Sequence, residues 1–478
     1  MLKESFLKKL KNSINYQNHK LNNPLSKIPS VERILQDKNI LSLIKILSRK
    51  TLTDIIRKII SEEKKQFHMH GQLYSAKERI DRIKEYAKKE QSTFLNQVIN
   101  GSGVILHTNL GRAPLGREIY SILEESLRGY SNLEYNLFEG KRGHRGESVE
   151  KLLCTLSKAE SSLVVNNNAG AIFLILNSLA KDKEVIVSRG ELVQIGGGFR
   201  IPDILKQSGA KLVEIGTTNQ TFIKDYENAI RPQTAFILKV HQSNFKMDGF
   251  TNQVDVKRLK LIGRKYKLPI VVDLGSGTFL NSEDFGLKHE PTVQENIKHG
   301  AEIVCFSSDK LLGGPQGGII CGKEKYLKKL YQNPVFRALR VGKLTLFLLQ
   351  EVLLTYLKNE ATSRIPIWKM ISCPLDVIRT RNQKIYQELI KENIPVFLKE
   401  GQTAIGGGSL PGQTLPTQLI YIKPSCSLKS FSKELRLFNP PLLGRKEKEY
   451  FVLDPRSFET IYDELVIKII KKVYSKTK

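Results

Sequence analysis

A short apolar run that ends near a lysine is the segment of this 478-residue chain best suited to covalent chemistry. Residues 303–306 read as a buried strand, and Lys310 and the glycine-rich residues 313–318 follow it. Ligands of open α/β sheets bind beyond the carboxyl ends of the strands. A lysine shielded there can lose its proton and form a Schiff base with an aldehyde. The alternative interpretation is a surface lysine beside a turn.

An acidic residue occupies the equivalent place one strand–helix–strand unit earlier. Asp273 follows the apolar residues 269–272. A pyridoxal 5′-phosphate (PLP) enzyme needs a Schiff-base lysine and a carboxylate that keeps the pyridine nitrogen protonated. Asp273 alone could also cap a helix or bind a metal. Paired with Lys310, it predicts a PLP site.

Small residues after a third apolar run indicate a place for the cofactor phosphate. Asn168, Ala169 and Gly170 follow residues 162–165 and open a helical stretch. Free amides at a helix N-terminus bind phosphate, and small side chains let it approach. An ordinary asparagine N-cap is the alternative. Ser307 is a natural additional phosphate donor.

These segments belong to a longer alternation of strand-like and helix-like stretches. The strand-like runs are residues 162–165, 184–187, 211–214, 235–240, 269–272, 303–306 and 318–320. Apolar strands separated by helices predict a mainly parallel sheet covered on both faces. His241 follows one of these runs, so it is expected at the same edge as Lys310, although a core histidine fits equally well. Residues 1 to about 100 read as helical, and residues 346–478 as an α+β segment.

Composition sets the class of protein and of partner. The chain has 76 Lys or Arg against 48 Asp or Glu, a net charge of +28, and the first fifty residues alone carry +8. Such an excess favours anionic ligands, nucleic acid or an anionic membrane surface. The five cysteines are scattered without a C-x-x-C pair, so neither a disulfide framework nor a metal site is expected. No signal-peptide pattern or run of about 18 apolar residues is present, so we expect a soluble, cytoplasmic protein that inserts in no membrane.

Longer motifs resemble one known family. The chain is similar along nearly its whole length to bacterial selenocysteine synthase, the L-seryl-tRNA(Sec) selenium transferase. The matching stretches are residues 99–112, 187–193, 214–219, 239–250, 307–318 and 406–411. Two departures are visible: Gln194 stands where the family has glutamate, and Gly170 where it has alanine.

The resemblance implies a fold and an assembly. The expected fold is PLP-dependent fold type I, aspartate-aminotransferase-like, with a catalytic large domain at residues 101–345. A basic helical tRNA-binding domain at residues 1–70, a linker helix at 71–100 and an α+β small domain at 346–478 complete it. The family's bacterial members are ring-shaped decamers built from dimers. Seryl-tRNA(Sec) and selenophosphate are the implied partners, and DNA is not.

The resemblance also assigns roles to residues. Lys310 would hold PLP, and Asp309 belongs to the family's active site. Arg112, Arg337 and Arg340 match arginines that receive the anionic selenium donor, a task that suits guanidinium forks. If the segment around Arg337 and Arg340 is helical, the two lie on one face. The implied reaction eliminates the serine hydroxyl to give an aminoacrylyl-tRNA, to which selenium from selenophosphate adds.

Two other functions compete with this interpretation. A PLP lyase or transferase acting on a small amino sugar or amino acid would need no basic helical extension of about 100 residues. A non-enzymatic RNA-binding protein on an inactive PLP fold would have no reason to keep Lys310 together with Asp273. Charge on the extension attracts RNA phosphates, but charge runs are also common on solvated surfaces.

Overall fold

The computed structural model describes residues 24–195 and 198–477. The chain divides into two compact units. The N-terminal unit is Met1–Val98 with Leu437–Pro441, and the main unit is Ile99–Arg436 with Leu442–Lys478. The helical character predicted for residues 1–23 lies outside the described residues. The domain boundaries predicted at residues 70, 100 and 345 stay predictions.

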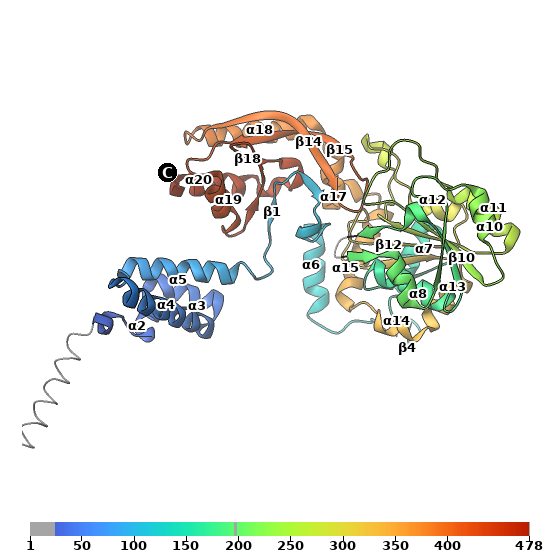
Figure 1. The fold of residues 1–478 in the computed structure, drawn as a ribbon, viewed down its shortest axis with the longest axis horizontal. Coiled ribbons are helices and arrows are strands. Elements are labelled where there is room, and N and C mark those ends of the chain that lie inside the picture. The colour runs from blue at the N-terminus through green and yellow to red at the C-terminus, as the bar shows by residue number, and fades with distance from the viewer. Residues whose placement is uncertain (1–23, 196–197, 478) are drawn as a thin grey trace, which may run out of the picture. The chain divides into compact units, whose positions relative to one another are not determined.

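The N-terminal unit is a bundle of amphipathic helices. They are α2 (Val31–Leu35), α3 (Lys38–Leu47), α4 (Arg49–His70) and α5 (Ala76–Gln91), drawn in blue in Figure 1. Each begins at a serine or aspartate whose side chain accepts a hydrogen bond from a first-turn amide. Isoleucines and leucines spaced along α3, α4 and α5 form a common core that includes Ile40, Leu52, Ile56, Ile59 and Ile83.

One buried ion pair fixes the corner between α4 and α5. The Arg79 guanidinium donates to both carboxylate oxygens of Glu63, at 2.6 and 2.8 Å, and to the carbonyl of Tyr74. The Tyr74 amide donates to the same carboxylate. Both charged side chains are more than 90% buried, so each depends on the other for compensation of its charge.

A seven-stranded sheet is the frame of the main unit. In spatial order it comprises β5 (Ser161–Val165), β13 (Gly318–Gly322), β12 (Ile303–Ser307), β11 (Ile270–Gly275), β10 (Thr234–Val240), β6 (Glu184–Ser188) and β9 (Lys211–Ile215). All strands are parallel except β13, which pairs antiparallel with both neighbours. All seven predicted strands are present, and the predicted α/β class with a mainly parallel sheet is confirmed.

Helices cover both faces of this sheet, so the central strands β11, β12 and β13 are buried along their whole length. One core joins the sheet to α8 (Asn168–Leu179), α9 (Ile201–Ser208) and α13 (Glu324–Gln332). The other joins it to α7 (Glu147–Ser157), α11 (Val256–Tyr266), α12 (Val293–Lys298) and α15 (Lys343–Leu357). Alternate residues of β10 divide between the two: Phe236 and Leu238 enter the first core and Ile237 the second.

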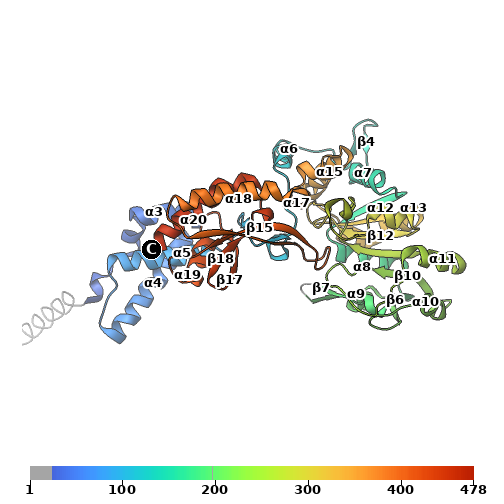
Figure 2. The ribbon, with the colours of Figure 1, turned by 90° about the horizontal axis from the view of Figure 1, so that it is seen from above.

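A second sheet has five strands. It comprises, in order, β17 (Arg445–Glu447), β18 (Tyr450–Leu453), β15 (Thr414–Ile422), β14 (Val396–Gly406) and β2 (Val104–Leu106). Figure 2 shows α18 (Leu375–Ile390) running along it. Strand β2 pairs in parallel with the end of β14, so that Leu106 lies opposite Gly406. This pairing brings the segment that carries Arg112 next to the glycine-rich turn after β14. Within the described ranges, no helix is both long and apolar enough to cross a membrane.

The buried pair of the N-terminal unit yields a stability prediction. Replacing Glu63 by Ala leaves the Arg79 charge buried without a partner, which costs about 3–5 kcal/mol. Hydrogen exchange of peptides from residues 31–91 should accelerate strongly, while exchange in the main unit stays unchanged. The matched control is Glu32→Ala, which breaks the exposed pair with Arg49 and should cost under about 1 kcal/mol. Equal acceleration in the two variants would contradict the role assigned to Glu63.

Candidate active site

A cavity of about 490 Å³ lies at the carboxyl edge of the central strands. Strands β10, β11 and β12 end beside it, as expected for a ligand site of an open parallel sheet. Eight of the predicted site residues line it: Arg112, Asn168, Ala169, His241, Asp273, Ser307, Asp309 and Lys310. Gly170, Arg337 and Arg340 do not line this cavity.

Lys310 is buried at the turn that follows β12, with only 4% of its surface exposed. Burial lowers the pKa of its ammonium group, and the nearby charge of Arg112 lowers it further; Asp273, Asp309 and Glu290 act in the opposite direction. A lowered pKa increases the fraction of Lys310 present as the nucleophilic free amine.

Two glycines make room for this amine. A Cβ on Gly408 would lie 2.8 Å from Lys310 Nζ, and one on Gly275 would lie 3.7 Å away. Both residues have positive φ, at +82° and +71°, which side chains other than glycine rarely adopt. The run of glycines at 406–408 was the sequence signal for this contact, but the contact itself joins residues almost one hundred positions apart.

Asp273 is fully buried in β11, beside the end of β10. Register places Val240 opposite Asp273, and the His241 amide donates to the Asp273 carbonyl at 2.8 Å. The Asn168 side-chain amide donates to the carboxylate at 2.8 Å. Burial raises the pKa of Asp273, and the hydrogen bond from Asn168 and the charges of Lys310 and His241 only partly oppose this. A buried carboxylate with one strong donor is suited to receive a cationic N–H from a ligand.

The N-terminus of α8 meets the cavity beside Asp273. Asn167 is its N-cap and accepts from the Gly170 amide at 2.8 Å, so this amide is already paired. Asn168 Oδ1 is buried and has no hydrogen-bond partner within the described chain. Ala169 lines the cavity, whereas Gly170 faces Asn166 and Leu339. A Cβ at Gly170 would lie 2.9 Å from Asn166 Oδ1. The glycine that replaces the family's alanine at this position therefore leaves room for the Asn166 side chain.

Arg112 and Asp309 form an ion pair on the wall of the cavity. Arg112 Nη1 lies 2.9 Å from Asp309 Oδ2, and the Ala113 amide donates to the Asp309 carbonyl. Arg112 has a left-handed backbone, with φ of +62°. The guanidinium is 29% exposed and so stays accessible to a ligand while Asp309 orients it.

Arg337 and Arg340 line a neighbouring cavity of about 380 Å³, together with Glu134, Arg142 and Arg145. Arg142, Arg145 and Arg340 all donate to Glu134. Their hydrogen bonds, that of Arg145 foremost, lower the pKa of Glu134. One chain therefore does not bring these two arginines into the Lys310 cavity.

The local structure around these arginines also differs from the helix considered above. Helix α14 (Pro334–Ala338) contains Arg337 but ends before Arg340. Arg340 instead forms a β-bridge with Val165, and the Leu339 carbonyl accepts from the Asn166 amide. The end of β5 thereby separates the two cavities, since Asn167 and Asn168 line the other one.

The residues present fit PLP. The cavity combines a buried lysine of lowered pKa, a buried carboxylate, an unpaired amide oxygen and a wall of small residues. Such a set can form a Schiff base with an aldehyde, pair with a protonated pyridine and admit a phosphate at a helix N-terminus. No cluster of side chains suited to a metal ion occurs among the residues described.

Comparison with known proteins decides the family. The L-seryl-tRNA selenium transferase family matches residues 98–459. The chain belongs to this family.

Individual relatives span nearly the whole chain. The L-seryl-tRNA(Sec) selenium transferase of Alkaliphilus oremlandii is 42% identical over 458 residues, covering 94% of this chain and 98% of its own length. That of Carboxydothermus hydrogenoformans is 43% identical over 439 residues, covering 91% and 94%. The resemblance noted in the sequence is confirmed.

A solved structure supports the fold. D-glucosaminate-6-phosphate ammonia-lyase superposes with a TM-score of 0.55 at 18% identity, covering 81% of this chain and 98% of that one. Together with the sheet order and the place of Lys310, this likeness confirms the predicted fold type I architecture.

The raised pKa of Asp273 yields a pH-dependent prediction. The folded protein binds this proton more tightly than the unfolded chain, so the stability that the group contributes is lost as pH rises through its folded-state pKa. Asp273→Asn should therefore raise the Tm of the cofactor-free protein at pH 7. The gain should shrink as pH falls toward about 4, the ordinary pKa of aspartate. Addition of PLP should stabilise the variant less than the unsubstituted protein.

Differential scanning fluorimetry across pH 4–8, with and without PLP, measures these effects. Asp248→Asn, at an exposed surface position, is the control and should change neither Tm nor the response to PLP. A lower Tm of cofactor-free Asp273→Asn at pH 7 would show that the carboxylate supports the fold instead of being held for a ligand.

Proposed function

We propose that this protein converts L-seryl-tRNA(Sec) to L-selenocysteinyl-tRNA(Sec), using PLP as cofactor and selenophosphate as selenium donor. The observation that carries the proposal is the pairing of buried Lys310 with buried Asp273 in one cavity. Membership of the selenium transferase family, with relatives that are 42% and 43% identical to this chain, supports the substrate.

The residues that would hold the cofactor come from the ends of three strands, β5, β11 and β12. Lys310 would bind it covalently, Asp273 would pair with its ring nitrogen, and Ser307 and Ala169 would lie at its phosphate. When bound, PLP supplies an electrophilic aldehyde carbon and a ring that withdraws electrons. Asn168 holds the Asp273 carboxylate by its side-chain amide, so we assign it a supporting role.

Lys310 has a second task once the substrate amine has displaced it. Its burial and the charge of Arg112 lower the pKa of Nζ, so the released amine takes up the Cα proton of the seryl group. Loss of that proton allows the β-hydroxyl to leave, as water once it is protonated. Selenium from selenophosphate then bonds to the same β-carbon and Cα regains a proton, while water cleaves the Se–P bond and phosphate is released. The narrow space beside Gly408 holds Nζ in place between these steps.

The donor is a small polyanion, and arginines are the groups that bind it. Arg112 lines the Lys310 cavity, and Arg337 and Arg340 line the one beyond the end of β5. A guanidinium group can donate two parallel hydrogen bonds to the oxygens of a phosphate-like anion. Because Arg340 is paired with Glu134 in this structure, the donor would bind Arg340 by replacing the Glu134 carboxylate.

We assign tRNA binding to the N-terminal unit. Residues 24–98 carry 16 Lys or Arg against 9 Asp or Glu, and the pairing of Arg79 with Glu63 leaves the other basic residues on helix surfaces. Such a surface attracts RNA phosphates and releases their counterions. We also propose a cytoplasmic location, where aminoacyl-tRNA is made and used.

We further propose a homo-oligomer, with the family's ring-shaped decamer built from dimers as the expected form. The hairpin of β3 (Tyr135–Asn136) and β4 (Lys141–Arg142) carries two large apolar side chains in full contact with solvent. Leu137 is 74% and Phe138 99% exposed in the single chain. Apolar groups projected in this way mark protein contacts, so a second copy of the chain is proposed to cover them.

The direct test supplies PLP, seryl-tRNA(Sec) and selenophosphate and identifies the aminoacyl group by mass spectrometry after hydrolysis. Selenocysteine is the expected product. Lys310→Ala should abolish it, and borohydride should trap PLP on the unsubstituted protein only, because no other buried amine lines the cavity among the described residues. Lys323→Ala, which breaks an exposed ion pair, is the control. A borohydride-trapped adduct of Lys310→Ala at the unsubstituted level would overturn the assignment.

Variants of Arg337 and Arg340 distinguish the two steps of the reaction, elimination of the serine hydroxyl and addition of selenium. Replacing Arg337 and Arg340 by Ala should leave PLP binding intact and elimination largely so, while selenium addition falls by roughly 10- to 150-fold per lost charge-assisted bond of about 1.5–3 kcal/mol. Lysine should rescue only in part, because it lacks the planar fork. Elimination product and selenocysteinyl-tRNA are quantified separately, with Arg189→Ala as a surface control. Equal loss of both steps would move the donor site elsewhere.

A further inference from the structure

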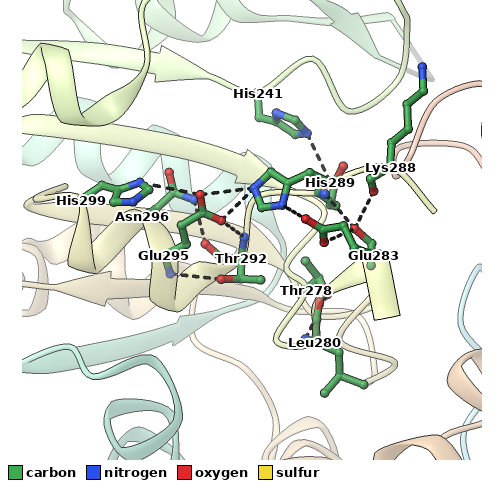
Figure 3. Close-up of polar contacts among 12 residues, drawn as sticks. His241, Thr278, Leu280, Glu283, Lys288, His289, Thr292, Glu295, Asn296 and His299 are labelled. Atoms are coloured by element: carbon green, nitrogen blue, oxygen red, sulfur yellow. Dashed lines mark hydrogen bonds and ion pairs between the residues drawn. The ribbon is translucent and has the colours of Figure 1, made fainter. Parts of the chain in front are cut away.

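A buried glutamate stands behind the histidine of the Lys310 cavity. Glu290 precedes α12 and is only 2% exposed. Its carboxylate oxygen Oε1 lies 3.2 Å from His241 Nε2; Figure 3 labels His241, and a dashed line from its ring marks a polar contact. His241 lines the cavity, and 25% of its side-chain surface is exposed. The acid is thus covered by protein, while the imidazole it contacts reaches the site.

The backbone of Glu290 is anchored independently of His241. Its amide donates to Ser282 Oγ at 2.8 Å, and Ser282 Oγ in turn donates to the Lys288 carbonyl at 2.6 Å. Ser282 is fully buried, and the Val293 amide donates to the Thr278 carbonyl on the far side of the loop. The backbone of Glu290 is therefore held in place by these hydrogen bonds, and its carboxylate can orient the His241 ring.

The chemistry of the pair restricts the imidazole. A carboxylate only accepts hydrogen bonds, so Nε2 of His241 carries the hydrogen. Nδ1 is then either the acceptor of a neutral ring or the second donor of a charged one. A buried carboxylate also needs its partner, because an uncompensated charge in the interior is costly. The charge of Glu290 also acts on Lys310, whose pKa it raises against the lowering by burial and by Arg112.

The residue before Glu290, His289, is a histidine without this arrangement. His289 is half exposed and lies between Glu283 and Glu295, at 2.6 and 3.0 Å. Burial acts to lower its pKa, and the hydrogen bonds and charges of the two glutamates outweigh it, so that the pKa is raised. Figure 3 shows His289 among these surface carboxylates. His289 does not line the cavity, which makes it a matched control from the same loop.

We propose that Glu290 is a positioning residue for the cofactor: it holds the His241 imidazole in one orientation and hydrogen-bonding state at the wall of the Lys310 cavity, so that PLP affinity depends on Glu290 through His241. The inference rests on the proposed use of PLP in this cavity. Glu290 itself touches neither cofactor nor substrate.

A double-mutant cycle on PLP affinity tests this. The dissociation constant is measured by titrating cofactor-free protein with PLP and following its visible absorption. His241→Ala and Glu290→Ala should each weaken binding about 10-fold or more, the effect of losing one hydrogen bond of about 1.4 kcal/mol. The double variant should bind no more weakly than the weaker single variant, because the two residues act as one unit. His289→Ala should bind PLP normally.

A conservative variant separates positioning from folding. Glu290→Gln keeps an oxygen that accepts from Nε2, so it should retain more affinity than Glu290→Ala even if the two cofactor-free proteins have the same Tm. Multiplicative losses in the double variant, or an unaltered affinity of Glu290→Ala beside a weakened His241→Ala, would overturn the inference and leave the proposed function standing. Failure of the unsubstituted protein to bind PLP would overturn the proposed function, and the inference with it.

Discussion

The burial of one amine and one carboxylate at the same sheet edge is the constraint on which the rest of the site depends. Desolvation disfavours the charged form of each group, so it lowers the pKa of Lys310 and raises that of Asp273. Both shifts would be lost in water. The protein must therefore cover both positions, and charges near Lys310 oppose one another: Arg112 lowers its pKa, whereas Asp273, Asp309 and Glu290 raise it.

Parallel strands provide those positions because their carboxyl ends meet at one edge. Asp273 lies opposite Val240 in β10 and Cys305 in β12, so its place is set by backbone pairing on both sides. Lys310 follows the end of β12 on a turn held by backbone hydrogen bonds, from the Gly313 amide to the Lys310 carbonyl and from the Leu311 amide to the Ser276 carbonyl. Rigid backbone holds the two side chains where flexible loops would let water between them.

Local patterns predicted these elements well, and contacts distant in sequence were beyond them. Short, mostly apolar runs separated by helix-like stretches identified all seven strands of the large sheet, because a sheet covered on both faces needs apolar residues in successive positions of its central strands. Lys310 and Asp273 followed from their places at strand ends. The approach of Gly408 to Lys310, the hold of Glu290 on His241 and the pairing of β2 with β14 each join segments far apart in the chain, and no periodicity encodes them. The helix expected around Arg337 and Arg340 ends early because the segment turns to bridge β5.

The side chains that change protonation and those that stay charged have opposite environments in this structure. Lys310 and Asp273 lie in the interior, where a missing water shell shifts proton affinity. Arg112 and Arg340 keep more than a quarter of their side-chain surface exposed, and a guanidinium stays charged at any physiological pH. Burial would not change the protonation of a guanidinium group, and it would add a desolvation cost. In a partly exposed position, an anion can bind the guanidinium group by replacing water or a carboxylate partner. Asp309 and Glu134 pair with these arginines and orient them. The end of β5 lies between the two cavities, because Arg340 bridges Val165 while Asn167 and Asn168 line the cavity that holds Lys310.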